Sequence, residues 1–220
     1  MTTRAVGIDL GTTFSAIAHV NKYGVPEILH NAEGERITPS VVLFEGEEVI
    51  IGTYARQSAV AYPEQVVEFI KRHMGDDDFS FEYRGEVYTP ERLSGFILAK
   101  LKHDAELRLG HRIDQAVITV PAYFGDKQRR ATIRAGEYAG LRVLSLLNEP
   151  TAAAFAYGLT NAGERKRFVL SWYPSHQDPP APIDPDAGLE TTARWWSDWS
   201  AQITYQGRYD AIVRRSLLIL

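Results

Sequence analysis

The chain has no cysteine among its 220 residues. Disulfides and thiol nucleophiles are therefore excluded, and a chain without disulfides suits a reducing compartment. The sequence also has no uninterrupted apolar run that approaches the ~20 residues of a membrane-spanning helix. Its first residues, Met1 to Arg4, contain no apolar signal core. We therefore expect a cytoplasmic protein.

The chain lacks an excess of positive charge as well. It has 24 Lys and Arg residues against 28 Asp and Glu residues, which gives a formal net charge of -4. Such a balance creates no general field that would attract nucleic acid or an anionic membrane, so we expect neither as a partner. Hydrophobic residues make up 45% and charged residues 24% of the chain, as in ordinary globular proteins, and the length allows one or two domains.

One short segment, residues 6–15, organises the rest of the chain. Apolar residues alternate with small or polar ones over residues 6–10, which predicts a half-buried strand. Gly11, Thr12 and Thr13 follow as a tight turn, in which glycine permits a backbone angle that other residues resist. The following amides and hydroxyls could then converge on an anion. The alternating apolar residues of the next predicted strand are Phe14, Ala16, Ala18 and Val20.

A carboxylate, Asp9, ends the first predicted strand and faces the same space as the turn. A phosphate would repel it unless a cation lay between them, and Mg²⁺ usually keeps several waters and takes few carboxylates. The segment therefore predicts a hairpin that holds a magnesium-bound phosphate. An ordinary Gly-Thr hairpin with a capping aspartate is the alternative.

The remaining pattern predicts a layered α/β domain with a mixed sheet, because an antiparallel meander is followed by alternating strands and helices. The strongest helix signal is Thr89-Pro90-Glu91, a capping hydroxyl followed by proline and an acidic first turn, and Gly110 ends that helix. Thr53, Asp126 and Thr151 are expected to cap three further helices. The other predicted helices are residues 53–60, 126–140 and 151–157, and the other predicted strands are residues 25–29, 37–44, 49–52, 66–70, 116–120 and 141–147.

Two charged residues lie at ends of predicted strands. Lys71 follows the apolar run Val66–Ile70, from which a basic side chain could project into a cleft, although a solvated Lys-Arg pair is the alternative. Glu149 follows the strand 141–147, where phosphate sites of α/β sheets commonly lie.

Five segments, taken together and in order, resemble the heat-shock 70 (DnaK-type) chaperone family. The resemblance covers about residues 4–160. The segments are residues 7–15 (GIDLGTTFS), 37–42 (ITPSVV), 71–75 (KRHMG), 117–124 (VITVPAYF) and 148–154 (NEPTAAA).

The resemblance implies the first lobe of an actin-like, ribonuclease-H-like domain that binds ATP and Mg²⁺. It places Asp9 near the magnesium, makes Gly11 to Phe14 the first phosphate loop (Gly11, Thr12, Thr13 and Phe14), and directs Lys71 at the γ-phosphate and attacking water. It assigns Glu149 to the shell of magnesium and water. Pro121 and Arg129 resemble a switch pair that relays nucleotide state, although Pro121 could simply end its strand and Arg129 could be solvated. Co-chaperones and unfolded protein are the partners that the family implies.

The family pattern stops after Gly158. No second loop of the form Asp-x-Gly-Gly-Gly-Thr follows, nor do the adenosine-binding segment, interdomain linker or substrate-binding domain. We therefore expect an ATP-binding lobe, residues 1–160, with half of the nucleotide site, so that ATP binds weakly and is hydrolysed little or not at all. The alternative is a non-enzymatic, partly unstable fragment or a lobe that binds partners.

The composition changes beyond residue 160. All 4 tryptophans lie after residue 165, as do prolines 174, 179, 180, 182 and 185. We expect an unrelated tail, residues 161–220, with one strand (168–172), a proline-rich linker and one or two helices (189–200 and 209–220). Residues 163–220 resemble glucoamylase- and trehalase-like glycoside hydrolases in the segments 168–172, 173–176, 195–199 and 215–218. No pair of catalytic carboxylates is identifiable, so we expect no glycosidase activity. A fusion of two truncated genes and a misassembled sequence both explain the change.

Overall fold

The computed structural model describes residues 5–160 and 184–201 and divides the chain into two compact units, Met1–Tyr157 and Gly158–Leu220. The strands are β1 (Ala5–Asp9), β2 (Phe14–Val20), β3 (Pro26–Ile28), β4 (Thr38–Pro39), β5 (Val42–Glu45), β6 (Glu48–Ile51), β7 (Val66–Val67), β8 (Phe81–Tyr83), β9 (Glu86–Tyr88), β10 (Gln115–Val120) and β11 (Arg142–Asn148). The α-helices are α1 (Thr53–Ser58), α2 (Pro90–Leu109), α3 (Asp126–Tyr138), α4 (Glu149–Thr160) and α5 (Pro185–Ala201), and the 3-10 helices are η1 (Pro63–Gln65) and η2 (Ile70–His73).

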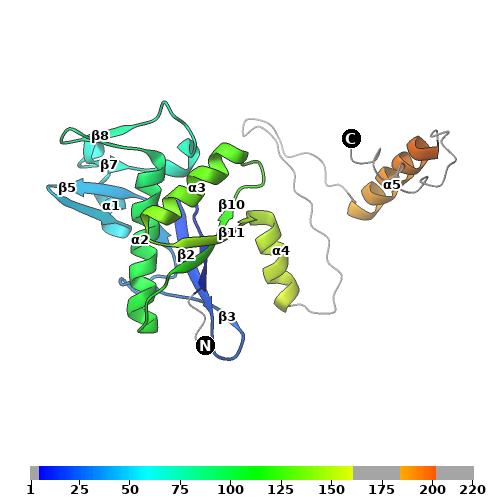
Figure 1. Cartoon of the computed structure of the whole chain (residues 1–220), viewed down its shortest axis with the longest axis horizontal. Coiled ribbons are helices and arrows are strands. Elements are labelled where there is room, and N and C mark those ends of the chain that lie inside the picture. Colours follow the sequence, from blue (N-terminus) through cyan, green and yellow to red (C-terminus); the bar gives the residue numbers. More distant parts are fainter. Residues whose placement is uncertain (1–4, 161–183, 202–220) are drawn as a thin grey trace. The chain divides into compact units, whose positions relative to one another are not determined.

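The first unit is built on a six-stranded mixed sheet, as the sequence predicts. Its strand order is β11-β10-β1-β2-β3, and β4 pairs with β2 outside this path. β1, β10 and β11 run parallel, whereas β2 and β3 run antiparallel to their neighbours. A three-stranded sheet (β6-β5-β7) and the hairpin β8-β9 complete the unit. The carboxyl ends of β1, β10 and β11 therefore meet at one edge of the large sheet (Figure 1).

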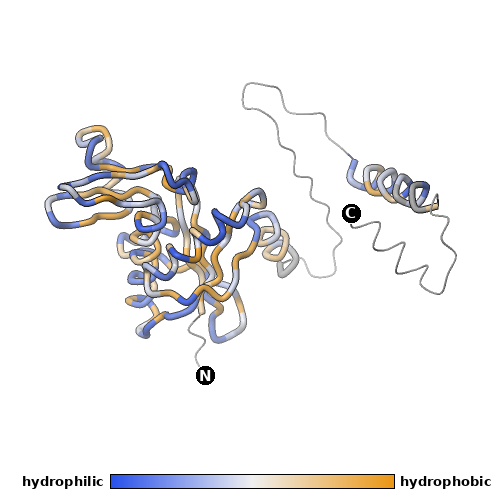
Figure 2. Tube along the Cα trace, turned by 45° about the horizontal axis from the view of Figure 1, so that its top comes forward, coloured by the Kyte–Doolittle hydropathy of each residue, from blue (hydrophilic) through white to orange (hydrophobic). Residues whose placement is uncertain are grey.

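Helices α2 and α3 pack against each other and against the sheet, through β2 for α2 and β11 for α3 (Figure 1). The predicted start of α2 is confirmed, because the Thr89 hydroxyl accepts a hydrogen bond from the Arg92 amide and Pro90 is the first helical residue. Gly110 ends the helix in a left-handed conformation (φ 69°). The buried face of α2 includes Leu93, Ile97, Leu98, Leu101 and Ala105, and Figure 2 shows apolar residues following the strands and helices of this core.

The buried face of β2 is the opposite of the one that the sequence predicts. Ser15 and Ile17 are buried, whereas Phe14 is 37% and Val20 59% exposed. A serine can be buried here because its hydroxyl is satisfied: it accepts a hydrogen bond from the Gly11 amide and bonds the Ser40 hydroxyl.

Three predicted helix caps are wrong. Gly52 precedes α1 with φ 104°, and the Thr53 hydroxyl instead donates to Glu35 Oε2. Asp126 is the first residue of α3 rather than its cap, which is Gly125. The last of these helices, α4, begins at Glu149 and continues beyond Gly158, so Thr151 lies inside it.

The predicted strand 37–44 is two short strands that belong to different sheets. β4 pairs with β2, whereas β5 pairs with β6 and β7. Pro39 lacks an N–H group and ends β4, and residues 40 and 41 cross between the sheets. The predicted strand after Val66 is also shorter, because β7 contains two residues and Lys71 lies in the 3-10 helix η2.

In the second unit the structure describes residues 158–160, which end α4, and residues 184–201. Helix α5 confirms the helix expected over residues 189–200 and begins earlier, at Pro185. The expected strand 168–172, the expected linker as far as residue 183 and the helix 209–220 lie outside the described residues. The linker was expected to extend to Pro185, but Pro185 is the first residue of α5. Within the described parts of the chain, none of the helices is long and apolar enough to span a membrane.

Candidate functional site

The candidate site lies at the edge where the parallel strands β1, β10 and β11 end. Asp9 is the last residue of β1 and pairs in register with Thr119 of β10, whose hydroxyl donates a 2.7 Å hydrogen bond to Asp9 Oδ1. Thr119 in turn pairs with Leu147 of β11, two residues before Glu149. Carboxyl ends of parallel strands are where open α/β sheets bind ligands. The register therefore brings Asp9 and Glu149 to one edge.

Lys71 reaches this edge from η2. Its ammonium pairs with Glu149 Oε1 across 78 residues of sequence, and the lysine side chain is only 8% exposed. The alternative of a solvated lysine is therefore wrong. A nearly buried ammonium requires such a partner, because a buried unpaired charge is strongly unfavourable. Lys71 and Glu149 form the central ion pair of the site.

The backbone before Lys71 adopts a conformation that side-chain-bearing residues seldom take. Phe69 precedes η2 with φ 57° and ψ 25°, in the left-handed region. The Arg72 guanidinium lies 4.7 Å from the centroid of the Phe69 ring. This left-handed residue opens the tight turn in which Lys71 lies, and such conformations concentrate at functional sites.

The turn Gly11–Thr13 directly follows Asp9 and Leu10. A Cβ atom on Gly11 would lie 2.0 Å from the Phe14 carbonyl oxygen, so no other residue fits. Gly11 is not among the glycines with positive φ, so the predicted reason for it, an unusual backbone angle, is wrong and close approach is the correct one. Its amide donates to the Ser15 hydroxyl (3.1 Å) and is engaged within the protein.

Thr12 and Thr13 keep their hydroxyls available. Within residues 5–160 and 184–201, neither hydroxyl has a hydrogen-bond partner. Both residues line a small hollow of about 50 Å³, together with Ser40, Val41, Arg56, Glu68 and Phe69. The turn is fixed from outside by the Ser40 amide, which donates to the Thr13 carbonyl (2.9 Å). The two threonine hydroxyls therefore lie near η2, the 3-10 helix that contains Lys71, because Phe69 lines the hollow and directly precedes η2.

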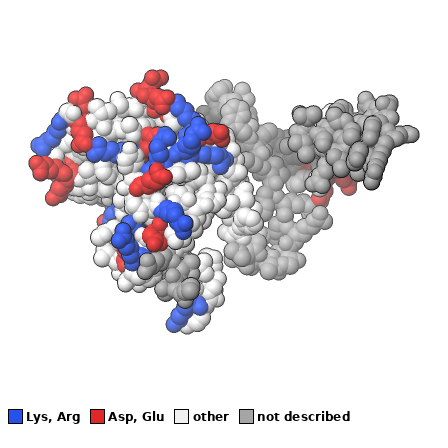
Figure 3. Space-filling view, viewed as in Figure 1, with Lys and Arg blue, Asp and Glu red and all other residues white. Residues whose placement is uncertain are grey.

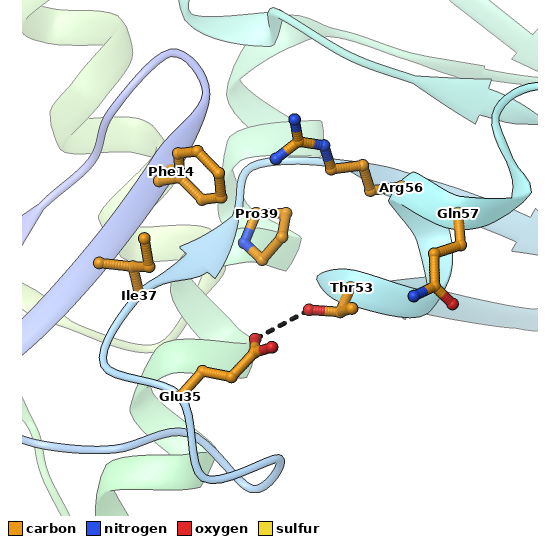
Figure 4. Close-up of a pocket in the computed structure, with 7 residues that line it drawn as sticks. All are labelled: Phe14, Glu35, Ile37, Pro39, Thr53, Arg56 and Gln57. Carbon is orange, nitrogen blue, oxygen red and sulfur yellow. Dashed lines mark hydrogen bonds between the residues drawn. The ribbon is translucent and has the colours of Figure 1, made fainter.

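The Phe14 side chain lines a different hollow from Thr12 and Thr13, the other side chains of the predicted phosphate loop. It lines a second hollow, of about 560 Å³, on the outward face of β2, together with Glu35, Ile37, Pro39, Thr53, Arg56 and Gln57 (Figure 4). The Arg56 guanidinium lies 4.9 Å from the centroid of the Phe14 ring. We call this space the Phe14–Arg56 hollow.

The predicted switch residues, Pro121 and Arg129, are linked through Phe124. Pro121 directly follows β10 and is buried, and its carbonyl accepts a hydrogen bond from the Phe124 amide (3.1 Å). Arg129 of α3 donates to the Phe124 carbonyl (2.8 Å) and to Asn148 Oδ1 (2.7 Å). Arg129 is therefore not merely solvated, and it joins the end of β10 to the residue before Glu149.

The donor set fits one magnesium ion held mostly through water. Asp9 is exposed, and only its Oδ1 atom has a hydrogen-bond partner within the described residues. No group of three or more histidines, aspartates or glutamates that could hold a metal occurs in the part of the chain that the structure describes. Mg²⁺ binds through one or two carboxylates with substrate phosphates and water completing its shell, so a single exposed carboxylate is compatible with it.

Sequence reasoning missed several residues of this edge. Thr119 orients Asp9, Asn148 receives Arg129, and Ser15 with Ser40 fixes the turn. Strand alternation together with the parallel pairing of β1 and β10 would have placed Thr119 beside Asp9. The basic side chains of α3 gather on the face seen in Figure 3 among acidic ones, and three of them form ion pairs: Lys127 with Asp77 (2.7 Å), Arg134 with Glu91 (2.5 Å) and Arg130 with Asp126 (4.0 Å).

Comparison with known proteins identifies the family. The model of the family described as "Hsp70 protein" matches residues 5–171, eleven residues beyond the expected limit near residue 160 and into the segment that resembles glycoside hydrolases. The "Chaperone protein DnaK" of Thermotoga petrophila is 51% identical over 166 residues, which cover 75% of this chain and 28% of that protein. The protein of the same name from Halobacterium salinarum is 51% identical over 167 residues, 76% of this chain and 26% of that protein. The chain thus spans little more than a quarter of the curated relatives that it matches, and it belongs to the Hsp70 family.

Proposed function

We propose that this chain is a magnesium–ATP-binding lobe of an Hsp70-type chaperone. The observation that carries the proposal is the convergence at one sheet edge of Asp9, the Gly11–Thr13 turn and the ion pair between Lys71 and Glu149. Hsp70 proteins form a family of ATP-binding chaperones, and the fold and the matched region agree with the first lobe of their nucleotide-binding domain.

In the proposed complex the terminal phosphates of the nucleotide lie at the turn. Thr12 and Thr13 would donate their hydroxyl protons to phosphate oxygens, which suits donors that have no other partner among the described residues. Asp9 and, through water, Glu149 would hold the metal, which supplies charge neutralisation between carboxylate and phosphate. Lys71 would move from Glu149 toward the γ-phosphate and the attacking water, because phosphoryl transfer depends on positioning and charge more than on covalent chemistry.

We propose weak binding and little or no hydrolysis by the 220-residue chain alone. A ligand bound at about 1 μM corresponds to roughly 8 kcal/mol of binding free energy. If the described lobe supplies about half of that, the dissociation constant is about 1 mM. Pro121 and Arg129 act as the switch pair in this proposal, co-chaperones and unfolded protein are the partners, and the location is the cytoplasm.

A thermal-shift experiment tests the proposal. With 10 mM Mg-ATP and a dissociation constant of about 1 mM, binding stabilises the folded state by about 1.4 kcal/mol, a rise of about 3 to 6 °C in Tm. The rise should disappear in Lys71→Ala and Thr12→Ala and persist in Lys22→Ala, which removes an exposed lysine from the β2–β3 turn. A rise that survives both site variants, or no rise in the parent chain, contradicts the proposal.

A second candidate function is partner binding through β11 and α4. Leu144 of β11 is 45% exposed and Phe155 of α4 is 64% exposed, and none of the described elements packs extensively against α4. Contiguous exposed apolar surface promotes association or aggregation. A concentration-dependent mass in light scattering that Phe155→Glu abolishes would favour this function over nucleotide binding, whereas a monomer at all concentrations would contradict it.

For residues 163–220 we propose descent from a glycoside hydrolase without glycosidase activity, joined to the Hsp70 lobe. The support is the change of composition beyond residue 165 and the resemblance of the tryptophan-bearing segments. Amplifying and re-sequencing the coding region across residues 155–170 tests the junction. An uninterrupted reading that continues into a second Hsp70 phosphate loop would contradict it.

A further inference from the structure

The Phe14–Arg56 hollow combines features that the proposed phosphate site does not use. Phe14, Ile37 and Pro39 form an apolar wall, and Figure 4 shows the polar side chains of Arg56 and Glu35 at opposite ends of the space. A volume of about 560 Å³ falls within the range of small-molecule sites, which are mostly apolar with a few convergent polar groups.

Arg56 supplies a cation at one end. Its guanidinium lies against the Phe14 ring at 4.9 Å, and within the described residues it forms no ion pair with a carboxylate. A guanidinium stacked on an aromatic ring presents a flat face that stacks on another planar ring, and its free N–H groups can bind an anion. Arg56 can therefore stack on a planar ring and pair with a negatively charged group that the ring carries.

Glu35 supplies an acceptor at the other end. Its Oε2 atom accepts hydrogen bonds from the Thr53 hydroxyl (2.8 Å) and, more weakly, from the Asn31 amide (3.4 Å). These two bonds hold the carboxylate in place, whereas its Oε1 atom has no partner within residues 5–160 and 184–201. A carboxylate repels an anion and accepts a donor, so the occupant needs an N–H group at this end.

We propose that the Phe14–Arg56 hollow binds a planar aromatic ring that carries an anionic group at one end and an amino donor at the other. The ring stacks on the Phe14 and Arg56 planes and contacts Ile37 and Pro39. The anionic group pairs with Arg56, and the amino group donates to Glu35. This chemistry is shared by a purine nucleotide and by a free amino-substituted aromatic acid.

The hollow also adjoins the proposed phosphate site. Arg56 borders both the Phe14–Arg56 hollow and the small hollow lined by Thr12 and Thr13. A phosphate at Thr12 and an anion in the Phe14–Arg56 hollow would therefore both interact with the Arg56 guanidinium.

Ligand-observed saturation-transfer NMR on the full chain tests the proposal with 6-amino-2-naphthoate as the probe. We expect saturable binding that weakens about tenfold, or by about 1.4 kcal/mol, in Phe14→Ala and in Arg56→Ala, because each substitution removes a stacking partner of the ring. Arg56→Lys should also weaken binding, since it keeps the charge and loses the planar face. The matched control is Tyr54→Ala, which removes an exposed aromatic ring from α1 outside the hollow and should leave binding unchanged.

Further measurements test the role of Glu35 as hydrogen-bond acceptor and whether the bound ring belongs to a nucleotide or to a free aromatic acid. 2-Naphthoate lacks the amino group and should bind more weakly to the parent chain, a difference that Glu35→Gln should reduce. Displacement of the probe by AMP but not by adenosine would identify the occupant as a nucleotide, and lack of displacement by AMP a free aromatic acid. No saturable binding, or binding insensitive to Phe14→Ala and Arg56→Ala, overturns the proposal. Because the probe has no phosphate, Lys71→Ala should not affect it, so failure here is distinguishable from failure of the proposed nucleotide function.

Discussion

Helices α2 and α4 both follow strands in the first unit, yet they use their apolar residues in opposite ways. α2 buries Leu93, Ile97, Leu98 and Leu101 against the sheet and α3, and both of its ends are capped. α4 has the sequence Ala152-Ala153-Ala154-Phe155-Ala156 near its centre, and most of these residues are exposed. Burial therefore depends on whether another layer lies opposite the helix, and apolar composition alone does not decide it.

The largest expected effect is the loss of stability when an apolar side chain of each helix is shortened to alanine. Leu98→Ala in α2 should lower the free energy of unfolding by about 2 to 5 kcal/mol, because Leu98 is fully buried and its removal leaves a cavity. Phe155→Ala in α4 removes more atoms but should change stability by less than about 0.5 kcal/mol, because the ring is 64% exposed. Urea denaturation of the full chain measures both values. A large loss in Phe155→Ala would show that α4 is covered by part of the protein.

The next effect concerns the ion pair that begins α4. Glu149→Gln should destabilise the chain by about 1 to 3 kcal/mol, because it leaves the nearly buried Lys71 ammonium without its charged partner. The matched variant is Asp77→Asn, which breaks an exposed pair with Lys127 at 2.7 Å and should cost about 0 to 1 kcal/mol. Equal losses in the two variants, measured by urea denaturation, would show that burial of Lys71 contributes nothing.

A smaller effect is expected at the helix starts. Thr89→Ala should cost about 1 kcal/mol, because it removes the side-chain oxygen that accepts the Arg92 amide of α2. Thr151→Ala should be close to neutral, since Thr151 lies within α4 and alanine is the better helix former. Thermal unfolding of the two variants side by side separates a capping threonine from an internal one, and a larger loss in Thr151→Ala would contradict the observed start of α4.

The smallest effect is on the pH dependence of stability, and it arises in the first turn of α2. Burial favours the neutral form of Glu91, but hydrogen bonds from Arg134, the backbone and Thr89 outweigh it, and the pKa of Glu91 lies below its ordinary value. The native state thus binds this proton less readily than the unfolded state. Its contribution is present above the unfolded pKa and is lost as pH falls through the folded pKa.

Glu91→Gln should therefore cost less than about 1 kcal/mol at pH 7 and nothing below both pKa values, since the Arg134 side chain is half exposed. Urea denaturation at a series of pH values from 7 to 3 measures the difference. Hydrogen bonds from Tyr88 and Arg92 also lower the pKa of Glu86, so part of the acid dependence should remain in the variant. A difference that stays constant with pH would contradict the assignment to Glu91.

Much of the fold follows from local pattern. The start and end of α2, the strands β3, β6, β10 and β11 and the mixed α/β class were predictable, because caps, prolines and buried apolar runs act within a few residues. Two of the predictions that were wrong depended on a distant partner. Ser15 is buried because Ser40 satisfies its hydroxyl, and Thr53 does not cap α1 because Glu35 accepts its proton.

The sequence by itself determined the family, the order of the elements and the residue types of the candidate site, since the motifs are short and contiguous. The tertiary structure alone decided which of these residues meet. Parallel pairing of β1 with β10 places Thr119 on Asp9, a left-handed residue before η2 precedes the turn that brings Lys71 to Glu149, and the face of β2 turns Phe14 toward Arg56. These contacts join residues far apart in the chain, and they depend on sheet register and side-chain direction, which local sequence does not specify.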